Sequence, residues 1–153
     1  MLYAVVLLLH SYLRWLVILA GAVALFRAAS GASRGASWTA ADDKAGFWFV
    51  TAVDTQVLLG ILLYGFLSPI TRQAFGDFSG VMGDSVRRFW VVEHITGMII
   101  GLALVHVGRV RTRRADSLRR HKVAAIFFGL ALVAILGSIP WPGMRAGRPL
   151  LRW

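Results

Sequence analysis

Four long apolar blocks, separated by short segments that carry nearly all of the charge, organise this sequence. They cover residues 2–26, 46–67, 89–108 and 121–139, the last with its apolar run beginning at Val123. A helix needs about 20 apolar residues to cross a hydrocarbon core of roughly 30 Å, and the blocks have lengths of that order. The pattern therefore predicts four membrane-spanning helices within a single transmembrane domain, residues 1–153.

The composition agrees with a chain that faces lipid. Of the 153 residues, 58% are hydrophobic and 16% are charged, whereas a soluble domain has about 45–50% apolar and about 25% charged residues. We therefore expect an all-α fold, an integral membrane four-helix bundle. Cysteine is absent from the sequence, which excludes disulfides, thiolate metal sites, iron–sulfur clusters and haem held by thioether bonds.

The distribution of charge predicts the orientation in the membrane. The formal net charge is +10, and the segment 109–122 carries many basic residues against the single acid Asp116. Basic loops stay on the cytoplasmic side, so this segment and the loop 27–45 are expected inside. Both termini then lie outside, as in a multi-pass protein of a bacterial inner membrane. The basic residues are not interleaved with aromatic residues on a soluble face, so we expect no nucleic acid partner.

Local signals predict where the helices begin and end. Thr39, followed by Asp42 and Asp43, is typical of a helix N-terminus. Ser68-Pro69 and Pro140 prevent two of the helices from continuing. The segment 28–37 is small and polar, which favours a flexible connector. The block from Val123 to Ile139 carries no charge, so we expect it to be the most lipid-exposed helix.

Ionisable residues inside the apolar blocks are the candidates for function. Each costs about 2.5–3.5 kcal/mol at the centre of a membrane helix, so each needs a partner or a role. His10 follows Leu2 by about 12 Å of helical rise and His94 follows Phe89 by about 7.5 Å, which places both histidines at similar depth on parallel helices. Two imidazoles at matched depth are what the axial coordination of a haem b iron needs.

Several neighbours extend this interpretation. Gly97 and Gly101 share a face with His94 and predict a smooth groove for a flat porphyrin, although such spacing is also a common helix-packing motif. Arg14 is expected to pair with a haem propionate, and Tyr64 to bond or stack at the edge. The leading hypothesis is thus a haem b electron-transfer protein that exchanges electrons with quinone or with a respiratory complex.

Two alternatives remain open from the residues. His106 and His121 lie near the cytoplasmic helix ends and predict either a second haem site or ordinary interfacial histidines. A cofactor-free membrane subunit or small transporter would instead use a buried polar network of Arg14, Asp54, Gln56 and Glu93. Nucleotide-binding, zinc-protease and serine-hydrolase motifs are absent from the sequence, so no enzymatic reaction is predicted.

The sequence also resembles a group of small four-span bacterial membrane proteins described as cytochrome b-like. The motifs that carry this resemblance cover nearly the whole chain: His10-Ser-Tyr-Leu-Arg14-Trp15, Gln56 to Gly60 with Tyr64, Ser68-Pro69, Arg88-Phe89, Glu93-His94, His121-Lys122 and Ile139-Pro140-Trp141. The resemblance implies a four-helix membrane fold and a cytochrome-like role, with less weight on the activity than on the fold.

Overall fold

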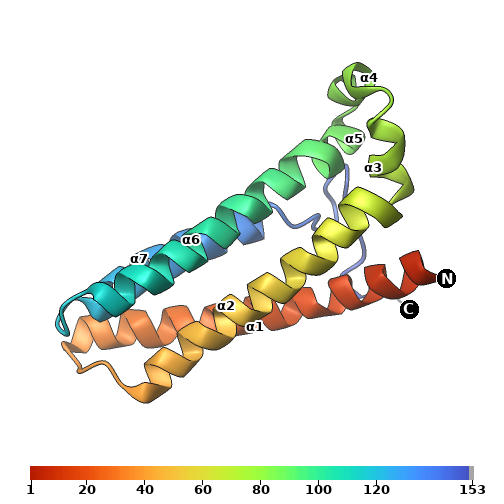
Figure 1. Cartoon of the computed structure of the whole chain (residues 1–153). Coiled ribbons are helices and arrows are strands. Elements are labelled where there is room, and N and C mark those ends of the chain that lie inside the picture. The colour runs from red at the N-terminus through yellow and green to blue at the C-terminus, as the bar shows by residue number, and fades with distance from the viewer. Residues whose placement is uncertain (152–153) are drawn as a thin grey trace.

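Four long helices form the bundle, and the computed structural model describes residues 1–151 of the chain (Figure 1). They are α1 (Leu2–Arg34), α2 (Ala40–Leu62), α6 (His94–Arg114) and α7 (Arg120–Gly137). A single π-helical turn extends α2, η1 (Leu63–Leu67), and another precedes α6, η2 (Phe89–Glu93). All four helices are long and apolar enough to cross a membrane, and the described residues form no strand. The predicted all-α, membrane-compatible four-helix architecture is confirmed.

The first helix is longer than the sequence predicts. It continues beyond Phe26 to Arg34, so most of the segment expected to be a flexible connector is helical. The serine hydroxyls in this stretch bond inside the helix: Ser30 donates to the Phe26 carbonyl at 2.7 Å and Ser33 to the Ser30 carbonyl at 3.0 Å. Gly35 then ends the helix in the left-handed conformation, with φ 60°, which glycine adopts without strain.

Thr39 begins α2 with a capping box, as the sequence predicts. The Thr39 hydroxyl accepts from the Asp42 backbone N–H at 3.3 Å, while the Asp42 carboxylate accepts from the Thr39 backbone N–H at 2.8 Å. These two bonds satisfy backbone donors that a helix start leaves without partners.

Removing this cap is expected to destabilise the bundle modestly. The Thr39→Ala variant loses the hydroxyl but keeps the Asp42 bond to the backbone, so we expect a loss of about 1 kcal/mol in unfolding free energy. In detergent solution this corresponds to a fall of about 2–4 °C in the thermal unfolding midpoint. An unchanged midpoint would show that the packing of α2, and not its cap, holds this end of the helix.

Helix α7 is the most buried of the four, which corrects the expectation that it faces lipid most. In its apolar window 33% of the residues are buried inside the protein, against 11% for α1. It packs against both α1 and α6, and its buried face contains Ala124, Phe128 and Ala131. Small residues let membrane helices approach closely, so packing contacts rather than polarity decide which helix lies inside. The absence of charge therefore did not indicate exposure to lipid.

The segment between α2 and α6 folds as three short helices at one end of the bundle (Figure 1). They are α3 (Pro69–Ala74), α4 (Phe78–Gly83) and α5 (Ser85–Arg88). Pro69 occupies the first turn of α3, as its fixed φ favours. Asp84 caps α5, and the N–H groups of Arg87 and Val86 that donate to it hold the pKa of its carboxyl below the usual range.

The N-terminus and the described part of the C-terminal tail lie toward the end of the bundle that carries α3 to α5, while the α1–α2 and α6–α7 connections lie at the opposite end (Figure 1). After α7 stops before Pro140, the residues up to 151 return across the bundle toward α1. Ile139 and Ala146 of this tail are buried, and the Arg148 backbone N–H donates to the Pro140 carbonyl at 3.1 Å. The tail is therefore part of the packed structure around the candidate site.

Candidate functional site

His10 on α1 and His94 on α6 face each other inside the bundle. Their ring centroids lie 6.4 Å apart, and the ring planes are inclined by 73°. The two imidazoles, which the sequence predicts at similar depth, therefore lie beside each other in the structure. Trp90, one turn before His94, packs its ring 5.7 Å from that of His94.

Hydrogen bonds leave one nitrogen of His94 available inside the bundle. Nδ1 of His94 donates to the backbone carbonyl of Ser138 at 2.7 Å, which orients the ring and leaves Nε2 as its second nitrogen. His10 is held differently: the Gln56 side-chain amide donates to the His10 backbone carbonyl at 3.0 Å. The His10 Nδ1 atom is buried without a hydrogen-bond partner.

Two cavities flank the histidine pair. The larger, of about 120 Å³, extends between α1, α2 and α6 toward α3, with Tyr64 on its wall. The smaller, of about 60 Å³, extends toward α7 and the tail, with Arg14 and Ile139 on its wall. The residues that line both cavities are Leu7, His10, Gln56, Val57, Trp90, His94, Met98 and Arg148. The histidines therefore lie where the two cavities meet.

Three polar atoms on these shared walls have no hydrogen-bond partner. They are Nδ1 of His10, Oε1 of Gln56 and Nε1 of Trp90, all buried. A buried polar group without a partner costs roughly 1–3 kcal/mol, so native proteins rarely leave several of them around one space. Their clustering is typical of a cavity whose occupant supplies the missing partners.

Two arginine side chains, one on α1 and one on the tail, lie beside the same cavities. The Arg14 guanidinium donates to the Leu150 carbonyl at 2.7 Å, and Trp15 Nε1 donates to the same oxygen at 3.2 Å. The Arg148 guanidinium lies over the Trp90 ring, 5.3 Å from its centroid. Sequence reasoning missed Arg148, because no periodic pattern predicts where an irregular tail returns to a bundle.

The predicted glycine groove faces elsewhere. A Cβ atom at Gly97 would meet the Ser138 hydroxyl, and one at Gly101 would lie 2.7 Å from Ile135 Cγ1, so both glycines allow α6 to approach α7 and the start of the tail. This is the helix-packing role of such spacing. The glycine beside the histidines is Gly60, where a Cβ would lie 3.3 Å from His10 Cε1. Tyr64 lines the larger cavity and donates its hydroxyl to the Val91 carbonyl at 2.9 Å.

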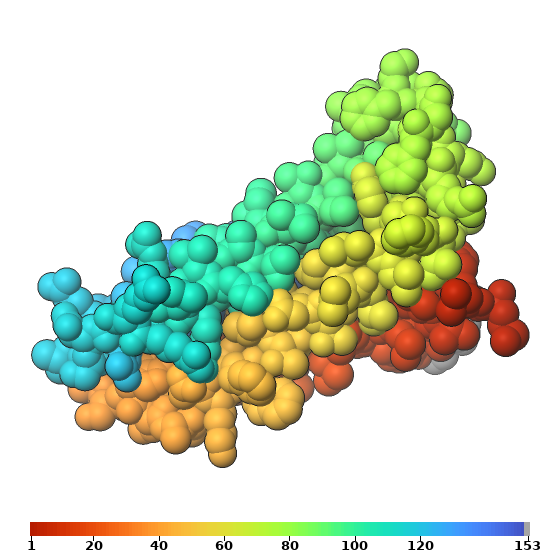
Figure 2. All heavy atoms as spheres, viewed as in Figure 1, coloured from red at the N-terminus to blue at the C-terminus, as the bar shows by residue number. Residues whose placement is uncertain are grey.

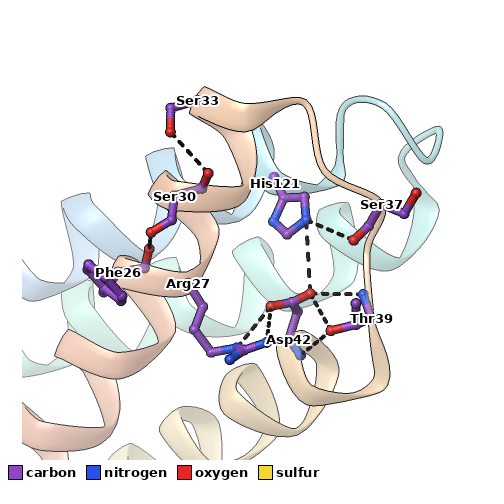
Figure 3. A network of polar contacts seen from close by, with 8 residues as sticks. All are labelled: Phe26, Arg27, Ser30, Ser33, Ser37, Thr39, Asp42 and His121. Atoms are coloured by element: carbon purple, nitrogen blue, oxygen red, sulfur yellow. Dashed lines mark hydrogen bonds and ion pairs between the residues drawn. The ribbon is translucent and has the colours of Figure 1, made fainter.

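The structure does not bring His106 and His121 together as a second site. His106 Nε2 donates to Asp54 Oδ1 at 2.7 Å on the surface of α2 and α6. His121 lies in a separate network at the opposite end from the tail, where its Nε2 is 3.4 Å from the Ser37 carbonyl and 3.9 Å from Asp42 Oδ2 (Figure 3). Each histidine has its own partners, which is the arrangement expected of ordinary histidines near the helix ends.

The predicted network of Asp54, Gln56 and Glu93 is also divided. Asp54 pairs with His106, Gln56 bonds the His10 carbonyl, and Glu93 pairs with Arg88 at 2.8 Å. Asp54 and Glu93 are both partly exposed. These three side chains form no continuous buried network with one another.

The donor set at the histidine pair restricts the kind of metal. Within residues 1–151 no group of three or more histidine, aspartate or glutamate side chains is arranged to hold a metal ion. A bare zinc ion takes at least three protein ligands, whereas a haem iron has four nitrogens from its porphyrin and needs two axial ligands. The two facing histidines by themselves supply two nitrogen ligands.

Comparisons with known proteins add no family assignment: no family model, no curated protein and no solved structure matches this chain.

Proposed function

We propose that this chain is a small membrane haem b protein with His10 and His94 as its axial ligands. The ring separation of 6.4 Å is the observation that carries the proposal. A first-row metal binds an imidazole nitrogen at about 2.0–2.1 Å, and the ring centroid lies about 1.2 Å behind that nitrogen, so two imidazoles on one iron have centroids about 6.4 Å apart. The histidines need no large movement to share one iron.

The surroundings of the pair support the same proposal. A ligating histidine usually donates its other ring nitrogen to a carbonyl or carboxylate, which fixes its tautomer; the Ser138 carbonyl does this for His94. A flat macrocycle between the imidazoles extends sideways from their common axis, and the two cavities meet at the pair. The cavities are smaller than a porphyrin, so binding requires their apolar side chains to move apart.

Two arginine side chains and the space beside Gly60 supply the remaining recognition. Arg14 and Arg148 line the smaller cavity at the tail and are the candidate partners of haem propionates. Gly60 leaves His10 free of a side chain on α2. Bound haem supplies a one-electron carrier in the bilayer, and we propose that quinone or a subunit of a respiratory complex exchanges electrons with it.

We further propose a bacterial inner membrane with both chain ends outside. The end of the bundle with the α1–α2 and α6–α7 connections carries ten basic residues: Arg27, Arg34, Lys44, Arg109, Arg111, Arg113, Arg114, Arg119, Arg120 and Lys122. Such an end stays on the cytoplasmic side. The histidine pair then lies nearer the outer face.

The first test is the visible absorption spectrum of the protein purified in detergent from haem-replete cells, oxidised and then reduced with dithionite. We expect a Soret band, sharp α and β bands on reduction, and about one haem per chain in a pyridine haemochrome assay, since one pair of axial ligands serves one iron. A colourless protein that also fails to take up added haemin would contradict the proposal.

A further inference from the structure

A polar pair lies on the outer surface of the bundle, away from the histidine site. His106 on α6 donates to Asp54 on α2 at 2.7 Å, and the two side chains are 50% and 40% exposed. Helices α2 and α6 run side by side on the face turned toward the viewer in Figure 2. Neither cavity at the histidine pair includes these two residues, so these cavities do not supply water to them.

This pair lies well inside both membrane-spanning segments. Asp54 follows Lys44 by ten residues, about 15 Å of helical rise from the basic end, whereas His106 precedes Arg109 by three, about 4.5 Å. The bond of 2.7 Å between the two side chains places the His106 imidazole at the depth of the Asp54 carboxylate. Aspartate and histidine side chains are too short to reach the headgroups from that depth. Ionisable residues at such depths almost always face protein or water rather than lipid, because hydrocarbon cannot solvate them.

The surface around the pair is apolar and uncovered. Exposed large hydrophobic side chains surround it on both helices: Phe47, Leu58 and Ile61 on α2, and Ile99 and Val110 on α6. They lie three to seven residues from Asp54 or His106, the spacing of one helix face. Ala103, one turn from His106, is also exposed and leaves room for close approach. We call this surface the α2–α6 face.

We propose that the α2–α6 face is the interface of a homodimer and that its occupant is a second copy of this chain. The face offers one acid and one base, so it is complementary to itself. Two copies inserted in the same orientation are related by a two-fold axis along the membrane normal, and such an interface is isologous. Because Asp54 and His106 bond to each other, they share one depth. In the dimer the two pairs therefore meet at the axis, each acid beside the partner's base.

Cysteine cross-linking in native membranes tests this interface. The sequence contains no cysteine, so any disulfide between copies comes from the introduced residue. The test variant is Ala103→Cys, on the α2–α6 face. The control is Val133→Cys on α7, which is also exposed and belongs to a helix outside the α2–α6 face. Its depth is close to that of Ala103, since Gly101 on α6 packs against Ile135 on α7. A disulfide forms when Cα atoms come within about 7 Å, so after oxidation we expect roughly tenfold more covalent dimer from Ala103→Cys than from the control.

Further outcomes separate the possible occupants. Adding Asp54→Ala to the Ala103→Cys variant removes the acid from the interface, and we expect roughly fivefold less covalent dimer. Equal cross-linking of Ala103→Cys and Val133→Cys, or a product whose mass corresponds to a different subunit, would overturn the homodimer. The haem spectrum is read on the same samples. Because Asp54, Ala103 and His106 do not line the cavities at the histidine pair, loss of the dimer with an intact spectrum contradicts only this inference.

Discussion

Replacing either His10 or His94 with alanine is expected to remove the haem. Each supplies one of the two axial nitrogens, and even the loss of a supporting partner of a metal ligand costs about 10- to 100-fold in affinity. We therefore expect His10→Ala and His94→Ala to be purified with at least roughly 100-fold weaker haem binding, seen as loss of the Soret and α bands. Truncation leaves a space of imidazole size, so added imidazole should restore part of the spectrum.

The matched control for this experiment is His106→Ala. It removes a histidine from the same helix, α6, but one that bonds Asp54 on the outer surface. We expect its spectrum to equal that of the unsubstituted protein. If His94→Ala keeps its α band while the protein remains folded, then His94 is not an axial ligand and the proposed site is wrong.

The second large effect is expected at the opposite end of the bundle. Asp42 is only 6% exposed and joins several segments in one network (Figure 3). Its carboxylate accepts from Arg27 Nε at 2.9 Å and from the Thr39 hydroxyl at 2.6 Å, besides the capping bond to the Thr39 backbone. His121, which packs directly on Gly31, lies on its other side. This single carboxylate therefore links α1, the connector, α2 and α7.

The Asp42→Ala variant is expected to lose about 3 kcal/mol in unfolding free energy, because it removes two kinds of contact at once. These are the capping bond to Thr39 and the pairing of a buried carboxylate with the partly exposed Arg27. The thermal midpoint in detergent should fall by about 5–10 °C. Asp42→Asn keeps much of the shape and one acceptor, so a smaller loss is expected.

Asp116→Ala is the control for charge alone. It removes the same charge from the same end of the bundle, at an exposed position, and a surface change of this kind is expected to alter stability by less than about 0.5 kcal/mol. If Asp42→Ala and Asp116→Ala have the same midpoint, the network in Figure 3 does not stabilise the fold.

Much of the architecture follows from local physical chemistry and was predictable from the sequence. Apolar blocks of about 20 residues specify membrane-spanning helices, because every backbone group in lipid must be bonded within the helix. Thr39 with Asp42 specified the start of α2, and Pro69 and Pro140 specified where helices stop, because proline lacks an N–H and restricts the residue before it. The depth of His10 and His94 follows from a constant rise per residue.

Other features depended on contacts between distant segments. Helix packing decides which neighbour Gly97 and Gly101 face, how deeply α7 is buried and which residue pairs with Asp54. In a membrane this packing rests on shape and small residues rather than on hydrophobicity. A sequence in which nearly every span residue is apolar carries little information about which face turns inward. The prediction from helical spacing alone therefore put the two glycines beside the proposed cofactor, whereas in the structure they pack against α7 and the start of the tail.

The sequence by itself determined the number of spans, several helix ends and the depth of the two histidines, because these depend on neighbouring residues and on the thickness of the bilayer. Only the tertiary structure decided that the tail places Arg148 over Trp90 and the Ser138 carbonyl against His94. These contacts join residues about 40 to 60 positions apart, and no local propensity encodes where an irregular segment returns. The rings of His10 and His94 meet for the same reason: the packing of α1, α6 and α7 sets the rotation of each helix about its own axis.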